Sequence, residues 1–203
     1  MSMSTSSQRS VLILILFCLL LTGCQSAMSS SSNMTPPPGH GPFTGTAADW
    51  PLWFIAHNFG VRCFDTQSCE VLYRGFPHGS DEPSPSVESF GEPLEELLRA
   101  GRGPIPNFPP PAIVTWKSKD GAPLRAEIDI GEIFKDKLIR HMVSREDISE
   151  VGSVPNPEII VEVNDRTINV YMRAMVYLKE PRFRDRPNSD YRYDLIKVFS
   201  KTY

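Results

Sequence analysis

Residues 158–178 read EIIVEVNDRTINVYMRAMVYL, and this stretch predicts a β-rich fold. Two runs rich in β-branched and aromatic residues, 158–163 and 167–178, flank the turn Asn164-Asp165-Arg166, which is typical of an antiparallel hairpin. In the second run, alternate residues from Ile168 to Val176 are apolar. The opposite face carries Asn169, Tyr171, Arg173 and Tyr177. A period of two predicts a strand that turns one face towards a core.

Two more hairpins are predicted closer to the N-terminus. Ala112–Lys117 (AIVTWK) leads to the turn signal Asp120-Gly121, and Leu124–Ile130 (LRAEIDI) then alternates apolar and polar residues. The aromatic-rich stretch from Trp50 to Phe64 is expected to be a strand, with Glu70–Arg74 (EVLYR) as its return strand.

The remaining segments complete an α+β pattern. Pro93–Ala100 has leucines at helical spacing, and Glu132–Met142 is expected to form a second short helix. Residues 75–92 and 103–111 have loop composition, and Tyr191–Tyr203 supplies a terminal strand. We therefore predict a single, mainly antiparallel β (α+β) domain with one or two short helices, and not a parallel doubly wound fold.

Residues 1–23 have the profile of an export signal. Arg9 precedes the uncharged run Val11–Leu21 (VLILILFCLLL). A membrane-spanning helix needs about 20 apolar residues, so a cleaved signal peptide is favoured over a permanent span.

The end of this segment, Leu21-Thr22-Gly23-Cys24, resembles the lipobox of bacterial lipoproteins. The resemblance implies cleavage before Cys24, a diacylglycerol on its thiol and a further acyl chain, such as palmitate, on its new amino group. Several acyl chains hold a protein stably at a membrane. Gln25, rather than Asp, after the cysteine favours anchoring in the outer membrane, on the side that faces the periplasm. Anchoring in the inner membrane is the alternative. The alternative is an ordinary signal peptide followed by an incidental cysteine.

Composition narrows the choice of partner. Removing residues 1–23 takes one Arg and no acid, which leaves 20 Lys and Arg against 24 Asp and Glu. A nucleic-acid-binding protein needs a concentrated basic face, so no nucleic-acid partner is expected.

Cys63 and Cys69 are the pair of cysteines left after Cys18 is removed and Cys24 is lipidated. In an oxidising compartment, a disulfide is favoured over free thiols. A metal site would need further Cys or His ligands close by in the sequence, and none is present.

The mature chain divides into a tether and a domain. Residues 24–47 are rich in Ser, Pro, Gly and Thr and almost free of charge, as in a linker. His40 is interpreted as part of this linker. Residues 48–203 contain all three Trp and all six Tyr and are long enough for one globular domain.

Signatures of catalysis are missing from the sequence. There is no G-x-S-x-G motif, no H-E-x-x-H motif and no phosphate-binding glycine loop. His57, His78 and His141 are dispersed and would have to converge in space to form a site. The carboxylate pair Glu95-Glu96 is interpreted as part of the solvent-exposed face of a helix, and the pair Glu127/Asp129 as part of the solvent-exposed face of a strand. We expect no enzyme activity, no catalytic residues, no metal, no cofactor and no small-molecule substrate.

Charge is distributed unevenly along the domain. Between Gly79 and Glu96 the chain has six acids and no base, whereas Lys179–Lys201 has seven bases and four acids. Solubility alone would explain this pattern. The more specific hypothesis is that a mobile acidic loop is attracted electrostatically to a basic cleft on a partner protein. Its candidate contact residues are Asp81, Glu82, Glu88 and Glu92.

The whole outline, a lipobox, a short tether and one domain without catalytic motifs, resembles the immunity lipoproteins of type VI secretion systems. Residues 53–65 (WFIAHNFGVRCFD), 126–137 (AEIDIGEIFKDK) and 162–174 (EVNDRTINVYMRA) are similar to lipoproteins of this kind that accompany lipase effectors. The resemblance implies a periplasmic protein that occludes a toxin of the phospholipase class, encoded by an adjacent gene.

Two other functions stay open. An envelope assembly or secretion-machine accessory lipoprotein would dock through a sheet edge. A periplasmic enzyme would require the dispersed histidines to meet carboxylates in a pocket.

Overall fold

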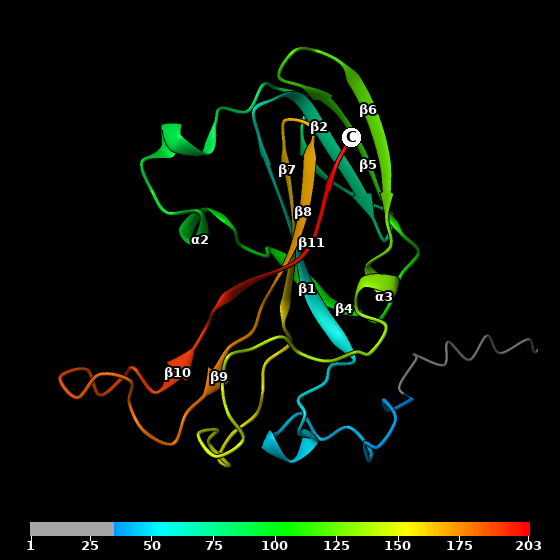
Figure 1. The fold of residues 1–203 in the computed structure, drawn as a ribbon. Coiled ribbons are helices and arrows are strands. Elements are labelled where there is room, and N and C mark those ends of the chain that lie inside the picture. The colour runs from blue at the N-terminus through cyan, green and yellow to red at the C-terminus, as the bar shows by residue number, and fades with distance from the viewer. Residues whose placement is uncertain (1–34) are drawn as a thin grey trace, which may run out of the picture. The chain divides into compact units, whose positions relative to one another are not determined.

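Two β-sheets form the framework of residues 35–203, the part of the chain that the computed structural model describes (Figure 1). The larger sheet has five strands, in the order β11 (Leu195–Thr202), β8 (Thr167–Arg173), β7 (Glu158–Asn164), β1 (Ala56–Phe64) and β4 (Arg102–Pro106). Its strands are antiparallel to their neighbours except for β1 and β7, which are parallel.

The smaller sheet has four antiparallel strands, in the order β3 (Phe76–Ser80), β2 (Thr66–Tyr73), β5 (Ala112–Ser118) and β6 (Pro123–Ile128). A separate two-stranded hairpin consists of β9 (Val176–Tyr177) and β10 (Tyr191–Arg192). The helical elements are short: η1 (Ala47–Asp49), η2 (Val87–Phe90), α2 (Leu94–Leu97) and α3 (Ile130–Ile133). The predicted class, mainly antiparallel β with short helices, is therefore confirmed.

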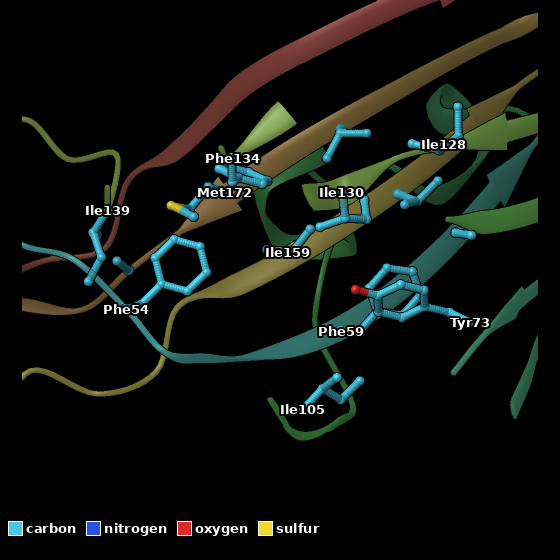
Figure 2. Packing of buried hydrophobic residues seen from close by; sticks show 14 of the residues in the cluster. Phe54, Phe59, Tyr73, Ile105, Ile128, Ile130, Phe134, Ile139, Ile159 and Met172 are labelled. Atoms are coloured by element: carbon cyan, nitrogen blue, oxygen red, sulfur yellow. The ribbon is translucent and has the colours of Figure 1, made fainter. Parts of the chain in front are cut away.

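The core lies between the two sheets. Val71 and Trp116 of the smaller sheet belong to the same buried cluster as Val161 and Met172 of the larger one. Figure 2 shows Phe59 of β1 lying against Tyr73 of β2, with 4.2 Å between the ring centroids. Burial of apolar side chains from both sheets supplies the main driving force for this arrangement.

Two of the three predicted hairpins are confirmed. β7 and β8 pair in register from Glu158–Arg173 to Asn164–Thr167, as residues 158–178 predict. β5 and β6 pair around the turn at Gly121, which has a positive φ of 84° that suits glycine. The terminal strand is also confirmed, since β11 pairs with β8.

The third hairpin prediction is wrong. β1 and β2 follow each other in sequence but belong to different sheets, because the chain turns at Asp65, with φ of 49°, and leaves the larger sheet. β1 pairs with β7 and β4, whereas β2 pairs with β3 and β5. Local alternation predicts strands, but contacts distant in sequence decide how strands pair.

Both segments expected to be loops contain a strand. β3 lies within residues 75–92 and pairs with β2. β4 starts at Arg102, continues into residues 103–111 and pairs with β1. The prolines and glycines of these segments led to the prediction of loops. Both strands lie at the edge of a sheet, where proline is tolerated.

The expected helices are shorter than predicted. α2 covers half of Pro93–Ala100. α3 is a single turn that ends at Ile133, so it overlaps only the first two residues of the predicted helix Glu132–Met142. Lys137 has a positive φ of 57°, and the chain beyond it lies beside residues 52–54, where Ile139 N donates to the Leu52 carbonyl over 2.8 Å. This pairing of backbone groups replaces the second helix.

The end of the expected tether contacts the domain. Phe43 lies edge-on to Trp53, with ring centroids 5.0 Å apart, and Pro37 and Ala47 are buried. The carboxylate of buried Asp49 accepts hydrogen bonds from the backbone of Thr44 and Gly45. Residues 35–47 therefore have a defined conformation against the domain.

The signal segment, Cys24 and the first part of the expected tether lie outside the described residues. From Thr35 onwards, no helix has both the length and the apolar character needed to span a bilayer.

Candidate functional site

The acidic segment between Gly79 and Glu96, which we call the acidic arm, starts at the end of β3. Near its start, Ser84 N donates to the Thr66 carbonyl over 2.8 Å, and Asp65 N donates to the Pro85 carbonyl over 3.2 Å. The arm therefore begins at the corner where the chain passes from one sheet to the other. It then continues through η2 to α2 (Figure 1).

The underside of the arm is apolar. Leu98, which follows the arm, is fully buried in a second cluster together with Phe64, Ile160 and Tyr171 of the larger sheet. Further apolar side chains pack around this cluster: Val87, Leu94, Leu97, Ala100 and Leu195. The arm and the residues after it thus cover the outer face of the larger sheet, on the side away from the main core.

A glycine in β1 permits this close approach. A Cβ atom at Gly60 would lie 2.1 Å from the Arg99 carbonyl oxygen, which is backbone and cannot rotate away. Glycine at this position therefore lets the chain that follows α2 lie directly against the sheet.

Arg173, at the end of β8, fastens α2 to the sheet. Its side chain is 2% exposed, and its guanidinium donates to the carbonyl oxygens of Glu95 and Leu98. These carbonyls lie at the C-terminal end of α2, where backbone acceptors lack helical partners and a cation is favoured.

A second buried polar group lies deeper under the arm. Glu162 of β7 accepts hydrogen bonds from the Tyr171 hydroxyl and from the Asn169 side-chain amide, both at 2.8 Å. Burial and the hydrogen bond to Glu162 raise the pKa of Tyr171 well above its usual range. The tyrosine therefore stays protonated as the donor to this carboxylate.

The four predicted contact residues, Asp81, Glu82, Glu88 and Glu92, are all exposed, as are Glu95 and Glu96. Hydrogen bonds from its own backbone and from Ser86 lower the pKa of Glu88, which keeps it ionised. Within residues 35–203, no group of three or more His, Cys, Asp or Glu has an arrangement suited to a metal ion. The arm presents its acids outward along its length rather than gathering them at one point.

A groove of about 370 Å³ runs between the arm and the end of β1. Arg62 lines it, with its guanidinium 5.0 Å from the centroid of the Phe90 ring, and Glu82 lies on the arm side. Phe90 itself is 37% exposed. Aromatic rings and guanidinium groups are enriched at the centres of protein interfaces, and this groove has one of each.

Cys63 and Cys69 form a disulfide, with their Cα atoms 6.4 Å apart. The bond links β1 to β2 across the corner between the two sheets, and Cys63 also lines the groove. The predicted pairing is thus present, although it joins two sheets rather than the two strands of a hairpin.

The three dispersed histidines have separate surroundings. His57 is fully buried between Asn107 and Tyr73, and burial lowers its pKa to about 4. His78 lies edge-on to Phe59, and His141 lies beside Trp50. Burial lowers the pKa of both, with the nearby Arg102 also lowering that of His78.

The buried polar residues under the arm, Arg173, Glu162 and Tyr171, were not predicted from the sequence. A charged residue inside each of the most apolar strands, EIIVEV and TINVYMR, was the available signal. Alternation assigned Tyr171 and Arg173 to an outer face, but only the tertiary structure places a covering segment over that face.

No protein-family model, curated protein or solved structure matches this chain.

Proposed function

We propose that this protein is a membrane-anchored periplasmic immunity lipoprotein, which binds a type VI secretion toxin of the phospholipase class and occludes its active-site cleft. The anchor would be the acylated Cys24, and the toxin would be encoded by an adjacent gene. The lipobox and the resemblance of residues 53–65, 126–137 and 162–174 to such lipoproteins are the starting points.

The observation that carries the proposal is the way in which the acidic arm is held. Its apolar side chains and the Arg173 hydrogen bonds attach it to the larger sheet, while its six carboxylates face outward. A surface that is ordered before binding loses less conformational entropy in the complex, which favours tight association.

The charge of the arm suits this kind of partner. An enzyme that cleaves phospholipids has to attract an anionic phosphodiester, so cationic side chains near its cleft are favourable. An acidic arm would compete for the same positive potential and would accelerate the encounter of the two proteins. Phe90, at the centre of the acidic segment, supplies an apolar anchor of the kind found at binding hot spots.

The test uses the toxin encoded by the adjacent gene and a variant with the arm neutralised, carrying Asp81→Asn, Glu82→Gln, Glu88→Gln and Glu92→Gln. The native protein should form a tight one-to-one complex and inhibit lipid cleavage. The variant should associate at least about tenfold more slowly at low salt, because it has lost the steering charges. Surface plasmon resonance at two salt concentrations measures this rate.

A matched variant removes four exposed acids away from the arm, through Glu127→Gln, Glu132→Gln, Glu146→Gln and Glu150→Gln. It should associate at nearly the native rate. Unchanged survival of a gene-deletion strain against toxin-bearing siblings would contradict the proposal. So would copurification with several envelope components and no toxin, which would instead favour the assembly role.

A further inference from the structure

A second charged surface is formed by residues 176–192, which we call the basic hairpin. It comprises β9, β10 and the loop between them, which contains the sequence PRFRDRP from Pro181 to Pro187. Backbone hydrogen bonds order the loop: Leu178 N donates to the Asp190 carbonyl, and Arg182 N donates to the Ser189 carbonyl. The hairpin therefore presents its side chains from a defined backbone.

Two arginines flank an exposed aromatic ring on this loop. The guanidinium carbons of Arg182 and Arg186 lie 5.4 and 5.2 Å from the centroid of the Phe183 ring, which is 45% exposed. Within residues 35–203, neither these arginines nor Arg184 forms a salt bridge, whereas Arg192 is paired with Asp194 at 2.7 Å. Three guanidinium groups are thus available to an external anion.

The same loop contains a hollow that could receive such an anion. Its volume is about 350 Å³, and its lining includes Arg182, Phe183, Arg186, Ser189 and Tyr191. Guanidinium groups bind phosphate oxygens through parallel hydrogen bonds, so this lining suits a phosphate group.

Apolar side chains are exposed around the hairpin. Five of the eight large hydrophobic side chains most exposed in the described residues come from positions 142–191. They are Met142, Val151, Tyr177, Phe183 and Tyr191. Arg192 joins two of these segments, since its guanidinium lies 3.8 Å from the Met142 sulfur. Aromatic rings among basic side chains are typical of surfaces that lie at a membrane interface.

The hairpin lies at the end of the domain where the described chain begins (Figure 1). Residues 137–154 connect the two: Lys137 Nζ donates to the Thr35 carbonyl, and Lys179 N donates to the Asp147 carbonyl. Ten residues lie between Cys24 and Thr35, and the eleven residue-to-residue steps that join them span at most about 40 Å. An acylated Cys24 would therefore keep this end of the domain close to the membrane.

We propose that the basic hairpin binds the anionic phospholipid headgroups of the membrane in which the protein is anchored. Arg182, Arg184 and Arg186 contact the lipid phosphates, and Phe183 inserts at the level of the headgroups. This inference rests on the proposed function for the anchor at Cys24, but it concerns a surface separate from the acidic arm.

Lipid contact at the hairpin would orient the domain. The arm begins beside Thr66 and Asp65, at the end of the larger sheet where β7 turns into β8, whereas the hairpin follows the other end of β8. The seven residues of β8 correspond to about 20 Å. The start of the acidic arm would consequently face away from the anionic membrane and towards the periplasm.

The test uses the chain from Gln25 to Tyr203, which carries no acyl group and contains the whole compact unit of residues 32–203. Cosedimentation with vesicles of phosphatidylcholine alone, or mixed with phosphatidylglycerol, measures binding. We expect binding to the mixed vesicles only, weakened by salt. Arg182→Gln, Arg184→Gln and Arg186→Gln together should lower the partition coefficient about 100-fold, at roughly fivefold per basic residue.

The matched control is Lys117→Gln, Arg125→Gln and Lys135→Gln, which removes the same charge from exposed positions elsewhere. It should change binding by less than about threefold. In a second variant, Phe183→Trp, brominated lipids should quench the introduced fluorophore.

Two results would overturn this proposal: no binding to the phosphatidylglycerol vesicles, or an equal loss in both triple variants. A failure to bind the phosphatidylglycerol vesicles would instead favour an acidic protein as the ligand of the hairpin. Neither result would bear on toxin binding, because these measurements contain no toxin.

Discussion

At the scale of single residues, the core contains a histidine whose proton position follows from its neighbours. The Asn107 side-chain amide donates to the Phe54 carbonyl, so its oxygen faces His57 and accepts from Nδ1 over 2.7 Å. The other ring nitrogen is therefore the acceptor for the Tyr73 hydroxyl, at 3.1 Å. Both nitrogens are satisfied in the neutral ring, which accounts for an uncharged histidine inside the core.

This histidine predicts a loss of stability in acid. Burial lowers the pKa of His57 from 6.5 to about 4, so below pH 6.5 the unfolded chain binds a proton that the folded chain does not. The free energy of unfolding should therefore fall as the pH falls from 6.5 to 4, by about 3 kcal/mol from this residue. Urea unfolding at a series of pH values measures the change.

The comparison that isolates His57 is His57→Gln, which should be less stable at neutral pH and should show a smaller decrease towards pH 4. His40→Gln removes a histidine outside the core and should retain the native pH dependence. The same decrease in the native protein and in His57→Gln would refute the assignment, since other groups would then account for it.

At the scale of elements, the acidic arm depends on side chains that are far from it in sequence. α2 is a single turn and gains little stability from its own hydrogen bonds. Its position comes from the apolar contacts of Leu98 and from Arg173, which is 75 residues further along the chain. The arm should therefore loosen when Arg173 is replaced.

Arg173→Met keeps a long side chain but removes the donors to the carbonyls of Glu95 and Leu98. Because buried acceptors would lose their partners, we expect the free energy of unfolding to fall by about 2 kcal/mol. Hydrogen exchange should accelerate at the Glu96 and Leu98 amides, which bond within α2. Mass-spectrometric hydrogen exchange on native and variant proteins measures this local effect.

Arg125→Met is the matched control, because Arg125 is exposed on β6. It should change stability by no more than about 0.5 kcal/mol and leave exchange in the arm unaltered. Native-like protection of the arm amides in Arg173→Met would show that apolar contacts alone hold the arm in place.

At the scale of the whole molecule, the structured domain includes residues that the composition assigns to a tether. Starting the chain at Ala48 removes Phe43, which contacts Trp53, and the buried Pro37 and Ala47. We expect the free energy of unfolding to fall by about 2 kcal/mol or more, since the apolar surface of the domain becomes exposed. Chemical denaturation measures this difference.

A chain that starts at Thr35 should match the stability of one that starts at Gln25, because it retains every one of these contacts. Equal stability of the chains starting at Thr35 and Ala48 would mean that residues 35–47 act only as a linker. The three lengths together define where the folded domain begins.

Features that depend on near neighbours in the chain follow from the amino-acid sequence alone. Runs of β-branched and aromatic residues, together with apolar alternation in β8 and β6, predicted β7, β8, β5 and β6. The turn residues around Asp165 and Gly121 predicted how these strands pair, because both turns are typical of tight antiparallel hairpins. The pairing of Cys63 and Cys69 was predicted because they are the two cysteines left in the domain in an oxidising compartment. The exposed acids of the arm were also predicted, since charged side chains in a segment without apolar periodicity remain in solvent.

Features that depend on contacts between distant residues become visible in the folded protein. It placed β1 beside β7, turned the chain at Asp65 into a second sheet, and laid the arm over Glu162 and Arg173. The physical reason is that sheet edges and apolar faces can be covered by any segment that completes their hydrogen bonds and buries their surface. The choice among such segments is made by the whole chain, through packing that no local pattern contains.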